Sequence, residues 1–185
     1  MQTKELIEQI NDLLKEKKRV IVAIEGGSAS GKTSLGKELE QLFDATILHM
    51  DDFFLRPEQR TKERLEEPGG NVDRERFKEE VAIPLQKGES IKYRRFDCST
   101  FSVLPAIEIK PAKLTIIEGA YSTHPELGKY YDLSVFLDID SKLQKERILR
   151  RNGQEKAERF FEKWIPMEQK YFEVFNVKEQ CDMIL

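Results

Sequence analysis

The amino-acid sequence predicts an α/β fold with a mostly parallel sheet. Short apolar runs alternate with segments of helical periodicity, and a glycine-rich loop joins the first run to the helix after it. Strands that alternate with helices in this way form a parallel sheet with right-handed crossovers. We expect core strands at residues 20–24, 45–49, 113–119 and 133–138, and a short fifth strand at 181–185.

Helices are expected where apolar side chains recur every three or four residues, at about 3–17, 32–43, 73–87, 142–151 and 155–174. Asn152-Gly153 is expected to end the fourth helix, and Pro166 to kink the fifth. Residues 56–72 are expected to form a loop and residues 90–109 a hairpin. The fifth helix carries an aromatic stripe that we expect in the core: Phe160, Phe161, Trp164, Met167, Tyr171 and Phe172.

Length and composition indicate one domain over residues 1–185. Charged residues make up 35% and hydrophobic residues 39%, and the net charge of −3 gives no reason to expect nucleic acid or an anionic membrane as a partner. No apolar run is long enough for a membrane span, and the N-terminus has no apolar secretory segment. Cys98 and Cys181 lack metal-site spacing, which favours reduced thiols in a cytoplasmic protein.

The loop after the first strand matches the pattern G-x-x-x-x-G-K-[ST]. Gly26 and Gly31 tolerate backbone conformations that larger residues avoid, and they leave room for the chain to wrap around a phosphate. The loop amides and the positive end of the next helix then face the anion. Lys32 reaches the β- and γ-phosphates, and the Thr33 hydroxyl binds Mg²⁺. The sequence therefore predicts a P-loop that binds nucleotide phosphates through Gly26, Gly27, Ser28, Ala29, Ser30, Gly31, Lys32, Thr33 and Ser34.

Acidic residues follow the second and third expected strands. Asp51 and Asp52 come after the second, and Glu118 ends the third. Open α/β sheets bind their ligands at this carboxyl edge. Because phosphoryl transfer needs a group that orients the attacking oxygen, we assign the general base to Asp51 and place Glu118 near Mg²⁺ or the acceptor. His49 is a ligand or base or, as is more usual for a lone strand histidine, a structural residue.

Two further features have both a structural and a functional interpretation. Arg147, Arg150 and Arg151 form either a solvated helix face or, as we prefer, a lid that closes over the polyphosphate and stabilises transition-state charge. Asp73 is either a helix N-cap or a substrate ligand.

A P-loop alone does not separate a kinase from a nucleotide-hydrolysing switch. Switch and motor proteins usually end the corresponding strand in D-x-x-G or Asp-Glu, whereas here the strand ends Ile116-Ile-Glu-Gly119. The short chain also leaves little room for motor or signalling machinery. Both observations favour a small-molecule kinase.

These motifs resemble the uridine kinase group of P-loop kinases, with phosphoribulokinase and pantothenate kinase as more distant relatives. The matching pieces are Gly26–Thr33, Asp51-Asp-Phe-Phe54, Asn71-Val-Asp73 with Phe77, Ile117-Glu-Gly119 and Arg147-Ile-Leu-Arg150. The resemblance implies a P-loop NTPase fold of the nucleoside-monophosphate-kinase type, with a five-stranded parallel sheet. It also implies a helical arginine lid at about 147–160, an acceptor-side insertion at about 55–109, and transfer from ATP·Mg²⁺ to a sugar hydroxyl that Asp51 faces.

Two segments depart from the uridine kinase pattern. Asp51-Asp-Phe-Phe54 stands where uridine kinases have Asp-Ser-Phe-Tyr, and Tyr93-Arg-Arg-Phe-Asp-Cys-Ser-Thr100 stands where they have Tyr-Asp-Phe-x-x-His. Only Tyr93 carries over in the second segment, and its two arginines suit an anionic acceptor. The first segment and Pro166-Met-Glu-Gln-Lys-Tyr171 also resemble nicotinamide riboside kinases.

The sequence thus predicts an ATP-dependent phosphotransferase with an alcohol group as acceptor, and a nucleoside such as uridine or cytidine is favoured. The alternatives are a kinase of nicotinamide riboside, pantothenate or a sugar phosphate, or a non-catalytic ATP-binding regulatory protein. ATP and Mg²⁺ are the expected cofactors, and a homo-oligomer is possible. The expected catalytic residues are Lys32, Asp51 and Arg147, the metal ligands Thr33 and Glu118, the further phosphate ligands Arg147 and Arg150, and the acceptor-binding residues Asp51, Asp73, Tyr93, Arg95 and Glu118.

Overall fold

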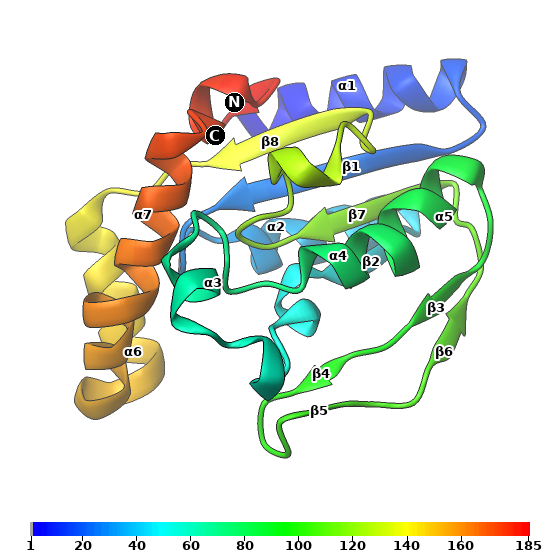
Figure 1. Cartoon of the computed structure of the whole chain (residues 1–185). Coiled ribbons are helices and arrows are strands. Elements are labelled where there is room, and N and C mark those ends of the chain that lie inside the picture. The colour runs from blue at the N-terminus through cyan, green and yellow to red at the C-terminus, as the bar shows by residue number, and fades with distance from the viewer. Residues whose placement is uncertain (1) are drawn as a thin grey trace.

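A five-stranded parallel sheet forms the centre of the computed structural model, which describes residues 2–185 (Figure 1). The strand order is β2-β7-β1-β8-β9, and every pair is parallel. The strands are β1 (Val20–Gly26), β2 (Thr46–His49), β7 (Leu114–Glu118), β8 (Leu133–Leu137) and β9 (Met183–Ile184). The P-loop NTPase fold class predicted from the sequence is therefore confirmed.

Two hydrophobic clusters cover the two faces of the sheet. Alternate residues of a strand point to opposite faces, so Val22 and Ile24 join one cluster while Ile21 joins the other. The first cluster also contains apolar residues of α1 (Gln2–Glu16) and α2 (Lys32–Phe43). The second contains residues of α4 (Arg74–Phe77), α5 (Ile83–Lys87) and α7 (Ile165–Val174). The sheet is thus buried on both sides, as its unbroken apolar strands predict.

Two helices contain a π-helical turn two residues before a proline. The turn η3 (Lys78–Ala82) lies between α4 and α5 and precedes Pro84. The turn η5 (Phe160–Trp164) precedes Pro166. Proline has no N–H and its ring clashes with the carbonyl four residues earlier, so widening the turn removes the clash. The kink expected at Pro166 therefore takes the form of a π-helical turn.

The helix that begins at Ser141 is interrupted at Gly153. α6 spans Ser141–Arg159, but Gly153 inside it has φ of 74° and ψ of 168°. These angles are not helical, and glycine adopts them without a steric penalty. Asn152-Gly153 therefore breaks α6 into two helical parts, at the position where the sequence predicted an end.

The acceptor-side region contains more regular structure than predicted. Residues 56–72 were expected to form a loop, but they include the 3₁₀ turn η2 (Pro57–Gln59) and α3 (Lys62–Glu66). Thr61 caps α3 by accepting a hydrogen bond from the Arg64 N–H. Helices of one turn are too short to show an apolar period, which is why the sequence pattern missed them.

The hairpin expected at residues 90–109 is present and projects from the sheet (Figure 1). It consists of two short antiparallel ladders, one between β3 and β6 and one between β4 and β5. The strands are β3 (Ile91–Tyr93), β4 (Phe96–Asp97), β5 (Ser102–Val103) and β6 (Ile107–Ile109).

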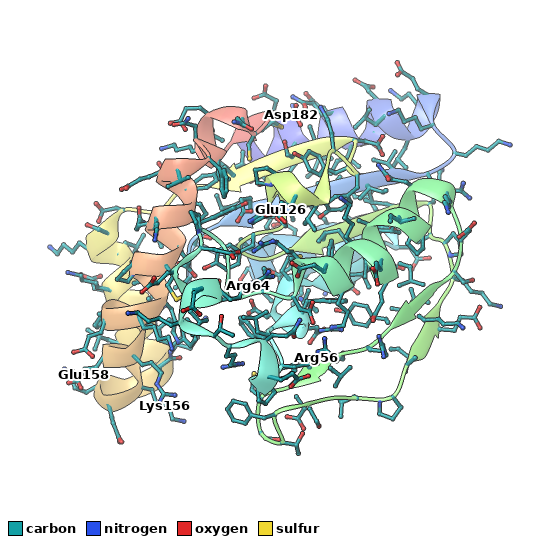
Figure 2. All side chains as sticks on the ribbon, in the orientation of Figure 1. Arg56, Arg64, Glu126, Lys156, Glu158 and Asp182 are labelled. Atoms are coloured by element: carbon teal, nitrogen blue, oxygen red, sulfur yellow. The ribbon has the colours of Figure 1, made fainter. Side chains whose placement is uncertain are left out.

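The aromatic stripe lies only partly in the core. Tyr171 is fully buried and Phe172 packs against the second cluster, but Phe160, Phe161, Trp164 and Met167 are only half-buried. Figure 1 shows α6 and α7 beside the carboxyl ends of the strands, and the outer part of α6 carries exposed charges such as Lys156 and Glu158 (Figure 2). The expectation for the first four residues was wrong, because this segment extends past the edge of the sheet.

Every helix within residues 2–185 is either too short or too polar to span a lipid bilayer.

A buried carboxylate joins the P-loop strand to the turn after β7. Glu25 is completely buried, and burial raises its pKa. Its oxygens accept hydrogen bonds from the N–H groups of Gly26 (2.9 Å), Tyr121 (3.0 Å) and Thr123 (3.1 Å). The hydroxyls of Thr123 (3.1 Å) and Tyr171 (3.2 Å) also donate to it. The Glu25 carboxyl group is tolerated out of contact with water because these donors replace the hydrogen bonds that water would make to it.

We expect Glu25→Ala to lower the free energy of unfolding by about 3 kcal/mol, because three N–H groups, two of them buried, lose their acceptor. Urea denaturation is the measurement. Glu89→Ala, at an exposed position, is the control and should change the stability little. A loss for Glu25→Ala no larger than that of the control would contradict the structural role.

Candidate functional site

The P-loop has the local geometry that its sequence predicts. β1 ends at Gly26, and α2 begins at Lys32. Gly26 and Gly31 have φ of 139° and 114°, in the region that favours glycine. A side chain on Gly26 would also place its Cβ 2.6 Å from the Leu137 carbonyl oxygen. Larger residues at these positions would disrupt the loop and its contact with β8.

Lys32 is buried against the loop that it follows. Its Nζ donates a hydrogen bond to the Gly27 carbonyl oxygen at 2.8 Å. A buried ammonium group at the start of a helix adds positive charge where the helix already favours anions.

Glu118 connects the P-loop to the end of β2. In the sheet it is the register partner of Ile24 on one side and His49 on the other. Its Oε1 accepts a hydrogen bond from Thr33 Oγ1 at 3.2 Å and lies 2.5 Å from His49 Nδ1. Burial alone would raise the pKa of Glu118, but the His49 hydrogen bond and nearby positive charge lower it below its usual value. The carboxylate is therefore held in its charged form.

The oxygen donors at this junction suit Mg²⁺. Residues 2–185 contain no group of three or more His, Cys, Asp or Glu side chains arranged to hold a metal by themselves. Mg²⁺ usually binds through one or two protein oxygens, with waters and substrate phosphates completing its shell. Thr33 Oγ1 and the Glu118 carboxylate, next to a P-loop, fit that pattern.

Asp51 lies close to this junction in the 3₁₀ turn η1 (Met50–Phe53). Its side chain is accessible to solvent, yet it is surrounded by a high density of protein atoms. This partial desolvation raises the pKa of Asp51, the Lys32 charge opposes the shift, and the Glu118 charge adds to it. Asp51, Lys32 and Glu118 therefore act on one another electrostatically.

Asp52, to which the sequence analysis gave no separate role, organises the acceptor side. It is buried, and it accepts hydrogen bonds from Tyr93 OH at 2.5 Å and from Arg95 Nε at 3.1 Å. The Tyr93 hydroxyl also contacts the backbone N–H of His49 at 3.1 Å. Tyr93 and Arg95 are thus brought to the site through Asp52. Its place beside Asp51 in the Asp-Asp pair was the signal available in the sequence.

Asp73 caps a helix, as one of its two interpretations predicted. Its Oδ1 accepts a hydrogen bond from the Arg76 N–H at 3.2 Å. Its Oδ2 is buried without a hydrogen-bond partner among residues 2–185, with Arg76 Nε at 3.4 Å and Arg56 Nε at 3.6 Å. Arg76 in turn donates to the carbonyl oxygens of Asp52 and Arg94, which fixes α4 against η1 and the hairpin.

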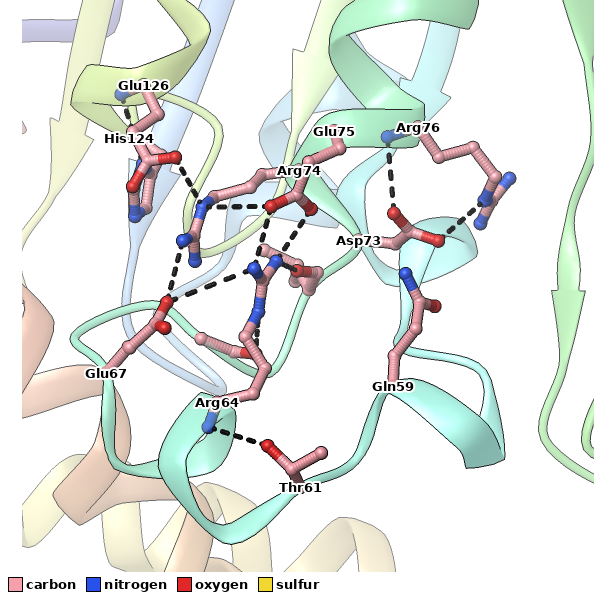
Figure 3. A network of polar contacts seen from close by, with 12 residues as sticks. Gln59, Thr61, Arg64, Glu67, Asp73, Arg74, Glu75, Arg76, His124 and Glu126 are labelled. Atoms are coloured by element: carbon pink, nitrogen blue, oxygen red, sulfur yellow. Dashed lines mark hydrogen bonds and ion pairs between the residues drawn. The ribbon is translucent and has the colours of Figure 1, made fainter.

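An arginine network, which the sequence analysis did not find, holds the segment before Asp73 in place (Figure 3). Arg64 donates to both carboxylate oxygens of Glu75 at 2.7 Å and to the carbonyl oxygen of Gly70 at 3.0 Å. Arg74 donates to Glu67 at 2.7 Å and to Glu126 at 2.9 Å. These bonds connect α3, α4 and the turn after β7. The segment that leads to Asp73 is therefore rigidly held.

The arginines of the hairpin and of α6 have different surroundings. Arg94 pairs with Glu80, whereas Arg95 pairs with Asp52. The side chain of Arg95 is 62% exposed. In α6, Arg147 Nη1 donates to the carbonyl oxygens of P-loop residues Ala29 (3.1 Å) and Ser30 (3.2 Å). Arg150 is exposed one turn later, and Arg151 packs over the Phe160 ring.

The His49–Glu118 pair predicts a pH-dependent contribution to stability. The Glu118 hydrogen bond raises the pKa of His49 above 6.5. The resulting stabilisation is complete below that ordinary value and is lost as the pH rises through the raised pKa. We expect the Tm difference between the wild type and His49→Asn, measured without nucleotide, to be larger at about pH 6 than at about pH 9. An equal difference at both pH values would rule out a charged pair.

Comparisons with known proteins agree with this geometry. A family model described as the phosphoribulokinase/uridine kinase family matches residues 21–162. A uridine kinase from Chloroflexus aurantiacus is 31% identical over 143 residues, which cover 72% of this chain and 68% of that protein. A uridine kinase from Brevibacillus brevis is 26% identical over 152 residues, which cover 75% and 68%.

Two solved structures share the fold. A possible uridine kinase from Bacillus stearothermophilus has a TM-score of 0.71 and 21% identity, with 98% of this chain and 99% of that chain covered. YFH7 from Saccharomyces cerevisiae has a TM-score of 0.72 and 15% identity, with 100% and 98% covered. The family model covers most of the chain, including the P-loop, Asp51 and Glu118. The protein is therefore a uridine kinase-like P-loop kinase and belongs to the phosphoribulokinase/uridine kinase family.

Proposed function

We propose that the protein transfers the γ-phosphoryl group of ATP·Mg²⁺ to a hydroxyl of a small acceptor, and that this acceptor is a nucleoside such as uridine or cytidine. The observation that carries the proposal is the contact between the P-loop and the two strand ends beside it. Thr33, Glu118 and His49 are joined there by hydrogen bonds, and Asp51 lies within electrostatic range.

On the donor side, the P-loop residues 26–34 bind the ATP phosphates through their amides and through Lys32. Thr33 and Glu118 hold Mg²⁺, directly or through its waters. When bound, the metal neutralises charge on the β- and γ-phosphates. The lowered pKa of Glu118 supports this role, because it keeps the carboxylate charged at neutral pH.

On the acceptor side, Asp51 orients the attacking hydroxyl and accepts its proton as the general base. Desolvation raises the pKa of Asp51, which brings its basicity closer to the operating pH. The nearby Lys32 charge limits this rise.

The lid arginines complete the phosphoryl-transfer site in this proposal. Arg147 lies at the P-loop, and Arg150 projects from the next turn of α6. An arginine close to the γ-phosphate stabilises the charge of the transition state. We propose that the lid, at about residues 147–160, and the acceptor-side insertion, at about 55–109, belong to a single kinase domain.

The acceptor itself is proposed from the contacts of Asp73, Tyr93 and Arg95. Asp52 pairs with Arg95 and so compensates its charge, which favours a neutral acceptor over an anionic one. The relatives from Chloroflexus and Brevibacillus, both named uridine kinase, agree with a nucleoside. Nicotinamide riboside is also a nucleoside and stays an alternative, whereas pantothenate and sugar phosphates are anionic. A cytoplasmic location and a homo-oligomeric state stay predictions.

The experiment that tests the proposal is coupled ADP release with ATP, Mg²⁺ and a panel of acceptors. Uridine or cytidine should stimulate ADP release. If only an anionic acceptor such as pantothenate or a sugar phosphate stimulates ADP release, the protein is a kinase but the proposal of a nucleoside acceptor is wrong. Tight ATP binding with no stimulation by any acceptor would support a regulatory ATP-binding protein instead.

We expect Asp51→Asn to lower kcat by about 10²- to 10⁴-fold, the usual contribution of a general base, while ATP affinity changes little. Steady-state kinetics and equilibrium ATP binding are the measurements. Asp44→Asn is a matched control, because Asp44 is exposed and has the left-handed conformation that asparagine tolerates. Turnover of Asp51→Asn at the wild-type rate would exclude Asp51 as the base.

A further inference from the structure

All three polar groups of Ser28 are bonded by side chains from the helices α6 and α7. The Ser28 N–H donates to Glu168 Oε2 at 2.8 Å, and the Ser28 hydroxyl donates to Glu168 Oε1 at 2.6 Å. Gln144 Nε2 donates to the Ser28 carbonyl oxygen at 2.8 Å. Ser28 is a P-loop residue, whereas Glu168 lies 140 residues later in the chain.

Helix α6 also bonds the next two residues of the loop. Arg147 donates to the carbonyl oxygens of Ala29 and Ser30. A side chain on Gly27 would lie 3.0 Å from Gln144 Nε2 and 3.5 Å from Glu168 Oε2. The outer turn of the P-loop is therefore packed and hydrogen-bonded against α6 and α7 over four consecutive residues.

Glu168 is an unusual residue to find in this position. Its side chain is buried, with 6% of the residue exposed, and burial raises its pKa while the Ser28 hydrogen bonds and the Lys32 charge oppose the rise. A carboxylate beside a P-loop also repels the phosphates that the loop binds. Phosphoryl transfer as proposed above gives this carboxylate no chemical step. A geometric role explains both its burial and its paired contacts with one residue.

We propose that Glu168 is a positioning residue for the nucleotide site. It fixes the orientation of the Ser28 peptide from α7, and in this way it holds the outer turn of the P-loop in its phosphate-binding conformation. Nucleotide affinity thereby depends on how α6, which carries the lid arginines, and α7, which follows it, are placed against the loop. The inference rests on the proposed function, because it requires that the P-loop binds ATP.

The test compares equilibrium binding of a fluorescent ATP analogue with Mg²⁺ to the wild type, Glu168→Ala and Glu168→Gln. Glu168→Ala leaves the Ser28 N–H without an acceptor, and we expect the analogue to bind about tenfold more weakly, as for one lost charged hydrogen bond. Glu168→Gln keeps a carbonyl oxygen for the Ser28 N–H and an amide that donates to the Ser28 hydroxyl. It should therefore bind within about threefold of the wild type.

Kinetics separate positioning from catalysis. We expect Glu168→Ala to raise the KM for ATP more than it lowers kcat at saturating ATP, because the acceptor and the base Asp51 are untouched. Glu173→Ala, at an exposed position of the same helix, is the control and should change neither value. Thermal unfolding of each variant checks that it is folded. If Glu168→Ala is unfolded, Gln144→Ala is measured in its place, and it should weaken analogue binding while kcat is largely kept.

The outcomes distinguish this inference from the proposed function. If the wild type does not bind the analogue, the proposed function fails. If the wild type binds it and Glu168→Ala binds equally well, only the positioning role fails. Tighter binding by both Glu168 variants would also overturn the role, since it would mean that removal of a repulsive charge outweighs the loss of the contacts.

Discussion

The parallel register of β7 between β1 and β2 is the constraint on which the site depends. It places Glu118 opposite Ile24 on one side and opposite His49 on the other. One oxygen of Glu118 consequently contacts both Thr33, from the P-loop helix, and His49, from the strand that leads to Asp51. A shift of β7 by one residue would turn the carboxylate to the opposite face of the sheet and separate the two halves of the site.

Two buried carboxylates hold the P-loop from outside the site. Glu25 binds the turn after β7 and the Tyr171 hydroxyl, and Glu168 binds Ser28. Both acids lose their hydration and gain protein donors in its place. The strand that ends in the loop and the helix that covers it are therefore fixed by hydrogen bonds to buried carboxyl groups, in addition to the apolar packing of the two clusters. A loop rich in glycine, which is flexible by itself, becomes ordered through its surroundings.

The fold and the conformation of the P-loop were predictable from the sequence, because their signals are local. A buried strand, the Gly26–Thr33 pattern and the following helix are contiguous, and the parallel sheet follows from the alternation of strands and helices. The acceptor side was less predictable. Asp51 and Asp52 are adjacent, and only the 3₁₀ turn makes one accessible and buries the other. Arg94 and Arg95 are adjacent too, but Arg94 pairs with Glu80 whereas Arg95 pairs with Asp52. The arginine network and the contact of Glu168 with Ser28 join segments that are far apart in the chain, so no local sequence pattern predicts them.

ATP affinity with and without Mg²⁺, in the wild type and in Glu118→Gln, tests the central claim that the P-loop and the end of β7 form one ATP·Mg²⁺ half-site. Mg²⁺ should tighten ATP binding to the wild type. In Glu118→Gln this gain should largely disappear, while the affinity without Mg²⁺ should stay close to that of the wild type. If Glu118→Gln keeps the full gain from Mg²⁺, Glu118 does not hold the metal and the account of the site is wrong.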